Sequence, residues 1–335
     1  METNRENQLA EALARATSRH LGRAVRVEAL EHLSGGASRE TWAFDAVDPD
    51  GVLPLILRRD PESEADVPDD ALGERMDRAT EYAVIAAAAA AGVLVPKPCF
   101  LLRPADGAGT GFVMERVPGE TIARRILRDD AYRDAHGVMA AQCGRILVGI
   151  HAIDRVRLPA LPVLSAAAQI AMYRGILDDF GVAHPGFEFG LRWLGRNRPA
   201  GRPDDRLVHG DFRNGNIVVG AEGVRAALDW ELAHLGDPIE DLGWLCVKAW
   251  RFGAAPPVGG FGDRDDLVAG YEAAGGGPVA AELLRYWEVF GTMKWGVICL
   301  MQAFKHLRGA HRSVELAAIG RRAAETEYDL LNLIG

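Results

Sequence analysis

The chain changes character at Pro118-Gly119, and this change limits the folds that it can form. Before it, short runs rich in β-branched and aromatic residues alternate with turn residues, which predicts strands. After it, apolar residues recur at helical spacing over long stretches. A strand-rich part followed by a mainly helical part is typical of an α+β protein with two lobes. We therefore place the boundary at Val117–Gly119, between lobes of residues 1–117 and 118–335.

The N-terminal lobe contains five candidate strands and one long candidate helix. The turn sequence DPDG separates the second and third strands, which favours a hairpin. The helical stretch runs from about Ala71 to Ala91 and is ended by Gly92 and Pro96. The expected strands are Val25–Leu33, Thr41–Val47, Val52–Arg59, Pro98–Arg103 and Gly111–Arg116.

The C-terminal lobe is predicted to be mainly helical. Apolar residues at helical spacing predict helices at Ala135–Ile153, at Ser165–Phe180 and within Ala280–Leu333. Short strands are expected at Leu207–Val208, Ile217–Val219 and Arg225–Leu228, around a polar loop.

Composition excludes several classes of protein. The net charge of −9 argues against a general binder of nucleic acid or anionic membranes. No stretch approaches the roughly 18–20 apolar residues of a membrane span, and the N-terminus lacks a signal-peptide pattern. The cysteines form no CxxC pair, which favours reduced thiols over disulfides or a zinc site: Cys99, Cys143, Cys246 and Cys299. We therefore expect a soluble, cytoplasmic protein, and its oligomeric state stays open.

The segment Leu207–Asp229 carries the residues with the clearest chemistry. It places Asp211 and Asn216 five residues apart in a loop, and Asp229 at the end of the next strand. Phosphoryl transfer from MgATP needs a carboxylate that orients the attacking hydroxyl and accepts its proton. It also needs a carboxylate and an amide oxygen to hold Mg²⁺. The spacing alone would fit a solvated turn, but its combination with Asp229 and the flanking strands favours a reaction centre.

The motif HGDFRNGN resembles the catalytic loop of the aminoglycoside phosphotransferase and choline kinase superfamily, the small-molecule relatives of protein kinases. With LDWE and GDPIEDLGW, the chain is most similar to phosphotransferase domains fused to acyl-CoA dehydrogenases. The resemblance implies a bilobal protein-kinase-like fold, with a five-stranded antiparallel sheet plus a helix in a nucleotide-binding N-terminal lobe. It implies a larger, mainly helical C-terminal lobe for catalysis and acceptor binding. It assigns Asp211 as the catalytic base and Asn216 and Asp229 as Mg²⁺ ligands.

Other polar residues near this loop are given supporting roles. In the family His209 is a scaffold residue, so we expect it to hold the loop rather than transfer a proton. Asp237 and Asp241 are expected to cap helices or brace the catalytic loop. Glu231 could assist the metal, although a structural role is the favoured alternative.

The resemblance also implies an ATP site in the N-terminal lobe. The third strand ends LILR, which places Arg58 where kinases keep a lysine, and Arg still carries a permanent positive charge to the phosphates. Its acidic partner is expected on the following helix, where Glu81 is favoured over Glu74. Strand alternation turns Arg59 to the opposite face, where we expect a solvated surface charge.

Two further segments complete the expected nucleotide site. In SGGAS, the backbone of Ser34, Gly35 and Gly36 would approach the phosphates, although a simple turn is the alternative. GFVMERVPGE resembles the segment that receives adenine. There Met114 would line the pocket, while the Glu115 carbonyl and the Val117 N–H would bond the base edge.

These features favour an ATP-dependent small-molecule O-phosphotransferase. The alternative is a catalytically inactive nucleotide-binding regulatory protein of the same fold, because Arg58 replaces lysine and the glycine loop is weak. The HGD form and the lack of an APE-like segment argue against a protein kinase. The acceptor stays open between a hydroxyacyl-CoA-like metabolite and an aminoglycoside or macrolide, as does ATP against GTP. Residues 155–200 are expected to line the acceptor pocket.

Overall fold

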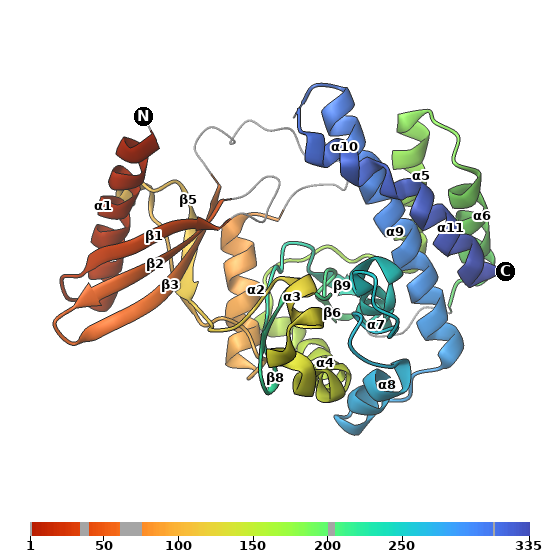
Figure 1. Cartoon of the computed structure of the whole chain (residues 1–335), viewed down its shortest axis with the longest axis horizontal. Coiled ribbons are helices and arrows are strands. Elements are labelled where there is room, and N and C mark those ends of the chain that lie inside the picture. Colours follow the sequence, from red (N-terminus) through yellow and green to blue (C-terminus); the bar gives the residue numbers. More distant parts are fainter. Residues whose placement is uncertain (1, 34–39, 61–75, 200–204, 311) are drawn as a thin grey trace. The chain divides into compact units, whose positions relative to one another are not determined.

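The computed structural model describes residues 2–33, 40–60, 76–199, 205–310 and 312–335 (Figure 1). Their contacts divide them into two compact units, with the boundary between Pro118 and Gly119. We call the described residues up to Pro118 unit 1 and those from Gly119 onward unit 2. Each unit has its own core and is described separately.

Unit 1 contains the predicted five-stranded antiparallel sheet, in the order β1-β2-β3-β5-β4. Its strands are β1 (Arg26–Leu33), β2 (Glu40–Asp48), β3 (Gly51–Asp60), β4 (Pro98–Leu101) and β5 (Thr110–Glu115). The DPDG hairpin between β2 and β3 is confirmed. The Asp48 carboxylate accepts the backbone N–H groups of Asp50 at 2.8 Å and Gly51 at 3.1 Å. Asp48 thus folds the turn by bonding its own following backbone.

Two helices flank this sheet, one more than the sequence analysis placed there. Helix α1 (Glu2–Leu21) buries Leu13 and Ala16 against Phe44 and Leu57 of the sheet. Helix α2 (Arg78–Ala90) is the predicted helix, and its N-cap Asp77 accepts the Thr80 N–H at 2.8 Å. The part of the predicted helix before residue 76 lies outside the described residues.

Unit 2 is mainly helical, as predicted. Its α-helices are α3 (Ala123–Arg128), α4 (Arg133–His151), α5 (Ala166–Phe180), α6 (Pro185–Arg196), α7 (Ile239–Cys246), α8 (Arg264–Ala273), α9 (Ala281–Leu307), α10 (Val314–Gly320) and α11 (Arg322–Ile334). Its strands are β6 (Arg206–Val208), β7 (Ile217–Gly220), β8 (Gly223–Ala227) and β9 (His234–Gly236). β6 pairs with β9, and β7 pairs with β8. Short 3₁₀ turns are η2 (Pro104–Asp106) in unit 1, and η3 (Asp130–Tyr132), η4 (Arg155–Arg157) and η5 (Lys248–Arg251) in unit 2.

Helices α7 and α9 cross at close range through two glycines. A methyl group on Gly243 would lie 2.5 Å from the Trp287 backbone, and one on Gly291 would lie 2.8 Å from a Val247 methyl carbon. Larger residues would separate the helices, because atoms in a packed core cannot approach so closely. This crossing sets the positions of the side chains that α7 and α9 direct at the catalytic loop.

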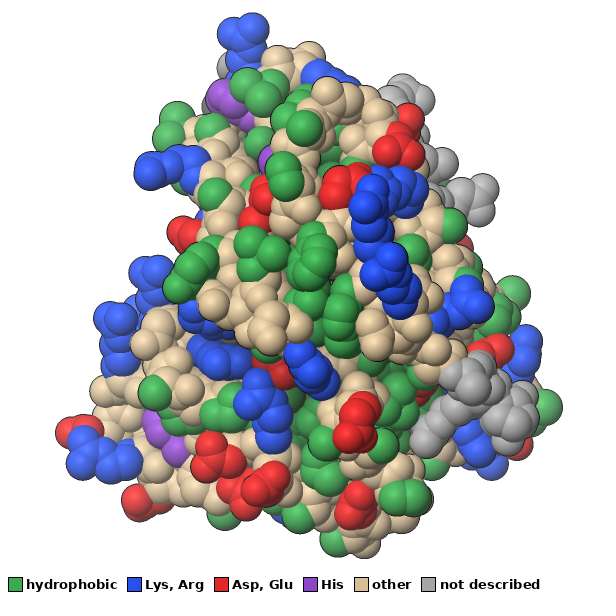
Figure 2. Space-filling view, turned by 90° about the vertical axis from the view of Figure 1, so that its right-hand side faces the viewer, with side chains coloured by type: hydrophobic (Ala, Val, Ile, Leu, Met, Phe, Trp, Pro, Cys, Tyr) green, Lys and Arg blue, Asp and Glu red, His purple; other side chains and the backbone are tan. Residues whose placement is uncertain are grey.

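Among the helices that the structure describes, none is long and apolar enough to cross a bilayer. All four cysteines are unpaired. Figure 2 shows acidic and basic side chains interspersed with hydrophobic ones on the face that it draws.

Candidate active site

The catalytic loop connects β6 to β7 and presents the Asp211 side chain to three donors. One carboxylate oxygen, Oδ1, accepts the Trp244 indole N–H at 2.8 Å and the Arg213 Nε–H at 3.0 Å. The other, Oδ2, accepts the Asn216 amide at 2.6 Å. Donors on both oxygens fix the orientation of the carboxylate. Asp211 is only partly buried, so part of its side chain stays accessible to solvent.

Asn216 and Asp229 are brought together by the β7–β8 hairpin. The Ile217↔Ala227 pair begins the ladder, and the Leu228 N–H donates to the Asn216 carbonyl at 2.8 Å. Asp229 follows directly, with a left-handed backbone (φ +66°) that few residues other than glycine adopt. Such backbone strain is concentrated at functional sites, where the surrounding structure maintains it.

The donor atoms of Asn216 and Asp229 fit a Mg²⁺ site. Because the Asn216 amide nitrogen donates to the Asp211 carboxylate and, at 3.0 Å, to its backbone carbonyl, the amide oxygen is the atom left for a metal. Among the described residues, no three His, Cys, Asp or Glu side chains gather as a metal cluster. Mg²⁺ in nucleotide enzymes is held by one or two protein oxygens together with water and phosphates.

Asp241 braces the catalytic loop from below, as expected. Its fully buried carboxylate accepts the N–H groups of His209 at 2.8 Å and Gly210 at 2.9 Å, and contacts His151 Nε2 at 3.0 Å. Burial would raise the pKa of Asp241, but the bonds and charge of these histidines lower it below the usual value. The Asp237 carboxylate accepts the Ile239 N–H at 3.0 Å, which caps the start of α7.

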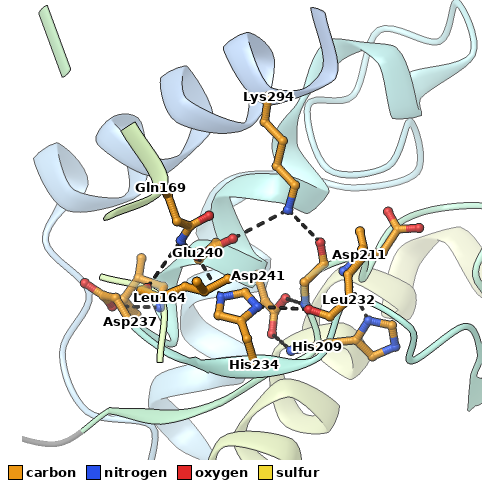
Figure 3. Close-up of polar contacts among 12 residues, drawn as sticks. Leu164, Gln169, His209, Asp211, Leu232, His234, Asp237, Glu240, Asp241 and Lys294 are labelled. Carbon is orange, nitrogen blue, oxygen red and sulfur yellow. Dashed lines mark hydrogen bonds and ion pairs between the residues drawn. The ribbon is translucent and has the colours of Figure 1, made fainter. Parts of the chain in front are cut away.

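A second buried network lies beside Asp241 (Figure 3). The Lys294 ammonium donates to the Gly210 carbonyl at 2.9 Å and lies 3.6 Å from the Glu240 carboxylate. Glu240 also accepts the Gln169 amide at 2.6 Å and lies 3.3 Å from His234 Nε2. These side chains come from α5, β9, α7 and α9, so the network links four elements beneath the catalytic loop.

Two buried histidines predict opposite effects of pH on stability. Burial would lower the pKa of His234, but the charge and hydrogen bond of Glu240 raise it overall. The His234 contribution is therefore complete below about pH 6.5 and is lost as pH rises through the raised folded-state pKa. Burial lowers the pKa of His209, so protonation of the unfolded chain costs stability below about pH 6.5.

We therefore expect His234→Gln to flatten the alkaline side of the stability profile. One proton changes the unfolding free energy by at most about 1.4 kcal/mol per pH unit. Urea unfolding at pH 6 to 8.5 measures this slope. Parallel profiles for the wild type and the variant would contradict the His234 assignment.

In unit 1, Arg58 and Glu81 form the expected ion pair. Arg58 Nη2 lies 3.1 Å from Glu81 Oε1, and the Glu81 side chain is fully buried. Arg78, which the sequence analysis did not consider, also pairs with Glu81 and bonds Asp60 at 2.8 Å. Glu81 therefore forms ion pairs with two arginines. The rival Glu74 lies outside the described residues.

The expectation for Arg59 was wrong. Its exposed fraction is 8%, and its guanidinium pairs with Glu40 at 2.6 Å and donates to the Ala108 carbonyl at 3.2 Å. Strand alternation does turn Arg59 away from the Arg58 side, but an acidic neighbour on β2 allows that face to bury a charge.

The expected adenine segment lies at the end of β5. Met114 is buried and pairs with Ile56 of β3. The Glu115 N–H donates to the Lys97 carbonyl at 2.9 Å, and Val117 is half-buried just before the unit boundary. The proposed phosphate-covering residues lie outside the described residues: Ser34, Gly35 and Gly36.

Several residues of these sites were not predicted from the sequence, among them Arg78, Arg213, Trp244 and Lys294. Arg213 lies inside the catalytic motif and Trp244 ends GDPIEDLGW, so their positions alone could have singled them out. Lys294 is the one charge in a long apolar run, TMKWGVICLM, which is a signal for a buried partner.

Comparisons with known proteins show which sequences and structures this chain is similar to. The model of the phosphotransferase enzyme family matches residues 29–285. Acyl-CoA dehydrogenase family member 10 of Mus musculus is 30% identical over 199 residues, which cover 55% of this chain and 18% of that protein. This chain therefore corresponds to a minor part of that relative.

Solved structures share the fold. A Ralstonia eutropha protein assigned to the aminoglycoside phosphotransferases is 21% identical, with a TM-score of 0.74 and 97% of each chain covered. A thermostable mutant of aminoglycoside phosphotransferase APH(4)-Ia, in ternary complex with AMP-PNP and hygromycin B, is 15% identical. Its TM-score is 0.63, and 96% of this chain and 98% of that chain are covered.

Proposed function

The chain belongs to the phosphotransferase enzyme family, and on this premise we propose that it transfers the γ-phosphate of ATP to a hydroxyl of a small molecule. One observation carries the proposal. The Asp211 carboxylate is held on both oxygens, by Trp244 at 2.8 Å and Asn216 at 2.6 Å, and the Asn216 carbonyl accepts the N–H of the residue before the strained Asp229. An oriented carboxylate next to metal-binding oxygens is the arrangement that phosphoryl transfer requires.

In the proposed reaction Asp211 orients the acceptor hydroxyl and takes up its proton. The hydroxyl oxygen forms a bond to the γ-phosphorus, the bond from that phosphorus to the β–γ bridging oxygen breaks, and ADP leaves. Trp244 and Asn216 keep the carboxylate aligned for this step, so positioning contributes much of the rate. Asn216 and Asp229 would hold Mg²⁺, which neutralises phosphate charge when bound.

We assign nucleotide binding to residues of unit 1. Arg58 would contact the phosphates and Glu81 would hold Arg58, with which it pairs at 3.1 Å. The remaining assigned residues are Ser34, Gly35, Gly36, Met114, Glu115 and Val117. The unpaired cysteines favour a reducing compartment, so we assign the protein to the cytoplasm.

Arg58→Met is expected to raise the KM for MgATP by roughly 10- to 100-fold, the range for losing a hydrogen bond to a charged group. Arg78 still pairs with Glu81, so the buried carboxylate keeps a cation and the fold is retained. Arg58→Lys restores the charge and should recover most of the affinity. Steady-state kinetics with a melting curve for each variant make the test. An unchanged KM in Arg58→Met would remove Arg58 from the nucleotide site.

The acceptor is proposed to be either a hydroxyacyl-CoA-like metabolite or an aminoglycoside or macrolide. The first class follows from similarity to a protein named as an acyl-CoA dehydrogenase family member. The second follows from solved structures of the same fold, one of which holds hygromycin B. Residues 155–200, which include α5 and α6, are assigned to the acceptor pocket.

The test is MgATP-dependent phosphorylation of a panel of hydroxylated compounds, followed by mass spectrometry, with Asp211→Asn as the control. The panel holds hydroxyacyl-CoAs, aminoglycosides, macrolides, choline and homoserine, and GTP is tried against ATP. A product that the control does not form would support the proposal and name the acceptor class. Tight MgATP binding without transfer to any acceptor or to water would favour the inactive regulatory protein.

A further inference from the structure

The Lys294 side chain lies next to the catalytic loop and contacts two of the groups that set the position of Asp211. Lys294 belongs to α9, is 4% exposed, and donates to the Gly210 carbonyl at 2.9 Å. That carbonyl belongs to the peptide that carries the Asp211 N–H. The same ammonium lies 4.7 Å from the centre of the Trp244 ring, whose N–H donates to the Asp211 carboxylate. One cation therefore touches the backbone and the side-chain support of Asp211.

Two buried charged side chains bond Gly210, one at its backbone N–H and the other at its carbonyl. Its N–H donates to Asp241 of α7 at 2.9 Å, while its carbonyl accepts from Lys294 of α9 (Figure 3). Its φ of +80° suits glycine, and a methyl group there would lie 2.3 Å from the Leu232 carbonyl oxygen. The loop at this residue is therefore confined by two helices and by the segment before β9.

Burying a lysine to bond one carbonyl carries a large desolvation penalty. Removing an ammonium from water is strongly unfavourable, and an apolar side chain would often serve stability equally well. The cost is offset by Glu240, which lies 3.6 Å away and is itself bonded by Gln169 and His234. The Lys294 ammonium carries this desolvation penalty and bonds Gly210, the residue before Asp211. This arrangement points to a role beyond stability.

We propose that Lys294 is a positioning residue, which fixes Asp211 by holding the Gly210 carbonyl and the Trp244 ring in one arrangement. The proposal rests on the proposed function for its kinetic consequence. Its structural consequence, a displaced hydrogen bond between Trp244 and Asp211, can be measured independently of turnover.

The kinetic test compares Lys294→Met with the double variant Lys294→Met/Glu240→Gln. The single variant removes the ammonium beside Glu240, which keeps only His234 and Gln169 as partners, so both its melting temperature and its kcat should fall, the latter by roughly 10- to 100-fold. The double variant also removes the Glu240 charge and should recover melting temperature, but its kcat should stay low because the Gly210 carbonyl still lacks its donor. The KM for MgATP should change little in either variant. Lys294→Arg keeps a donor and a charge, and should recover part of kcat.

Turnover is measured with the panel compound that the wild type phosphorylates, or as phosphate release to water. Unchanged kcat in Lys294→Met would overturn the proposal. Recovery of both kcat and melting temperature in the double variant would also overturn it, because the role of Lys294 would then be only to neutralise the charge of Glu240.

A spectroscopic arm covers the case in which the wild type transfers no phosphate, which would overturn the proposed function alone. The Trp244 indole N–H resonance, assigned with Trp244→Phe, reports its bond to Asp211. We expect this resonance to shift in Lys294→Met and in the double variant. A resonance that stays in place in both would overturn the positioning role whatever the activity.

Discussion

Asp211→Asn is expected to lower kcat for phosphoryl transfer by roughly 10²- to 10⁴-fold, the usual contribution of a general base. Asparagine keeps the shape of the side chain, and its amide oxygen can still accept the Trp244 indole N–H. It loses the ability to take the hydroxyl proton and to accept the Asn216 amide N–H on its second atom, whereas the bond from Asn216 to the backbone carbonyl of residue 211 at 3.0 Å remains. The affinity for MgATP should stay within about threefold, because Asp211 is not assigned to the nucleotide or the metal. Single-turnover kinetics and calorimetric titration with MgATP measure the two effects separately.

Trp244→Phe is the matched control for this prediction. It removes the indole N–H that lies 2.8 Å from the Asp211 carboxylate but leaves the base itself in place. Its kcat should fall by about tenfold, as expected for one hydrogen bond that orients the base. Near-normal turnover in Asp211→Asn would remove the central assignment. Loss of folding or of MgATP binding in that variant would instead give Asp211 a structural role.

Local chemistry made most of the strands predictable from the sequence, together with helices α2, α4 and α5 and the helical tail, whereas α3, α6, α7 and α8 were not predicted. The hairpin between β2 and β3 follows from Asp48, whose carboxylate bonds the next two backbone N–H groups available to it. Helix α5 begins after Ser165, whose hydroxyl caps the Ala168 N–H at 3.2 Å. Such interactions join residues two or three apart, so the sequence displays them directly. Strand β9 was missed because three residues, His234–Gly236, carry too little pattern.

The candidate site could be predicted only where its residues are close in sequence. Asp211 and Asn216 share one loop, and their contact at 2.6 Å follows from their spacing. The hydrogen bond from Lys294 to Gly210 joins residues 84 positions apart, and no sequence pattern predicts that the two residues meet. Arg59 was misjudged for the same reason, because its burial depends on Glu40 on the neighbouring strand. Long-range polar contacts depend on the final packing of the helices and strands.

Removing the Asp241 carboxylate should cause the largest loss of stability among these changes. We expect Asp241→Ala to lower the free energy of unfolding by about 3–5 kcal/mol, the range for breaking a buried charged network. The two N–H groups of His209 and Gly210 would lose their acceptor, and His151 would lose the carboxylate 3.0 Å from its Nε2. Water cannot replace these bonds at no cost, because Asp241 is fully buried.

Asp237→Ala, four residues earlier, is the control for this change. Asp237 is only partly buried and bonds a single N–H, that of Ile239 at 3.0 Å, so its loss should cost about 1 kcal/mol. Urea unfolding followed by tryptophan fluorescence compares the two. Six of the seven tryptophans lie after Gly119, so the signal reports mainly on unit 2. Equal losses in both variants would mean that the buried carboxylate beneath the loop contributes no more than an ordinary helix cap. A much larger loss in Asp241→Ala would show that α7 and the catalytic loop are stabilised as one unit.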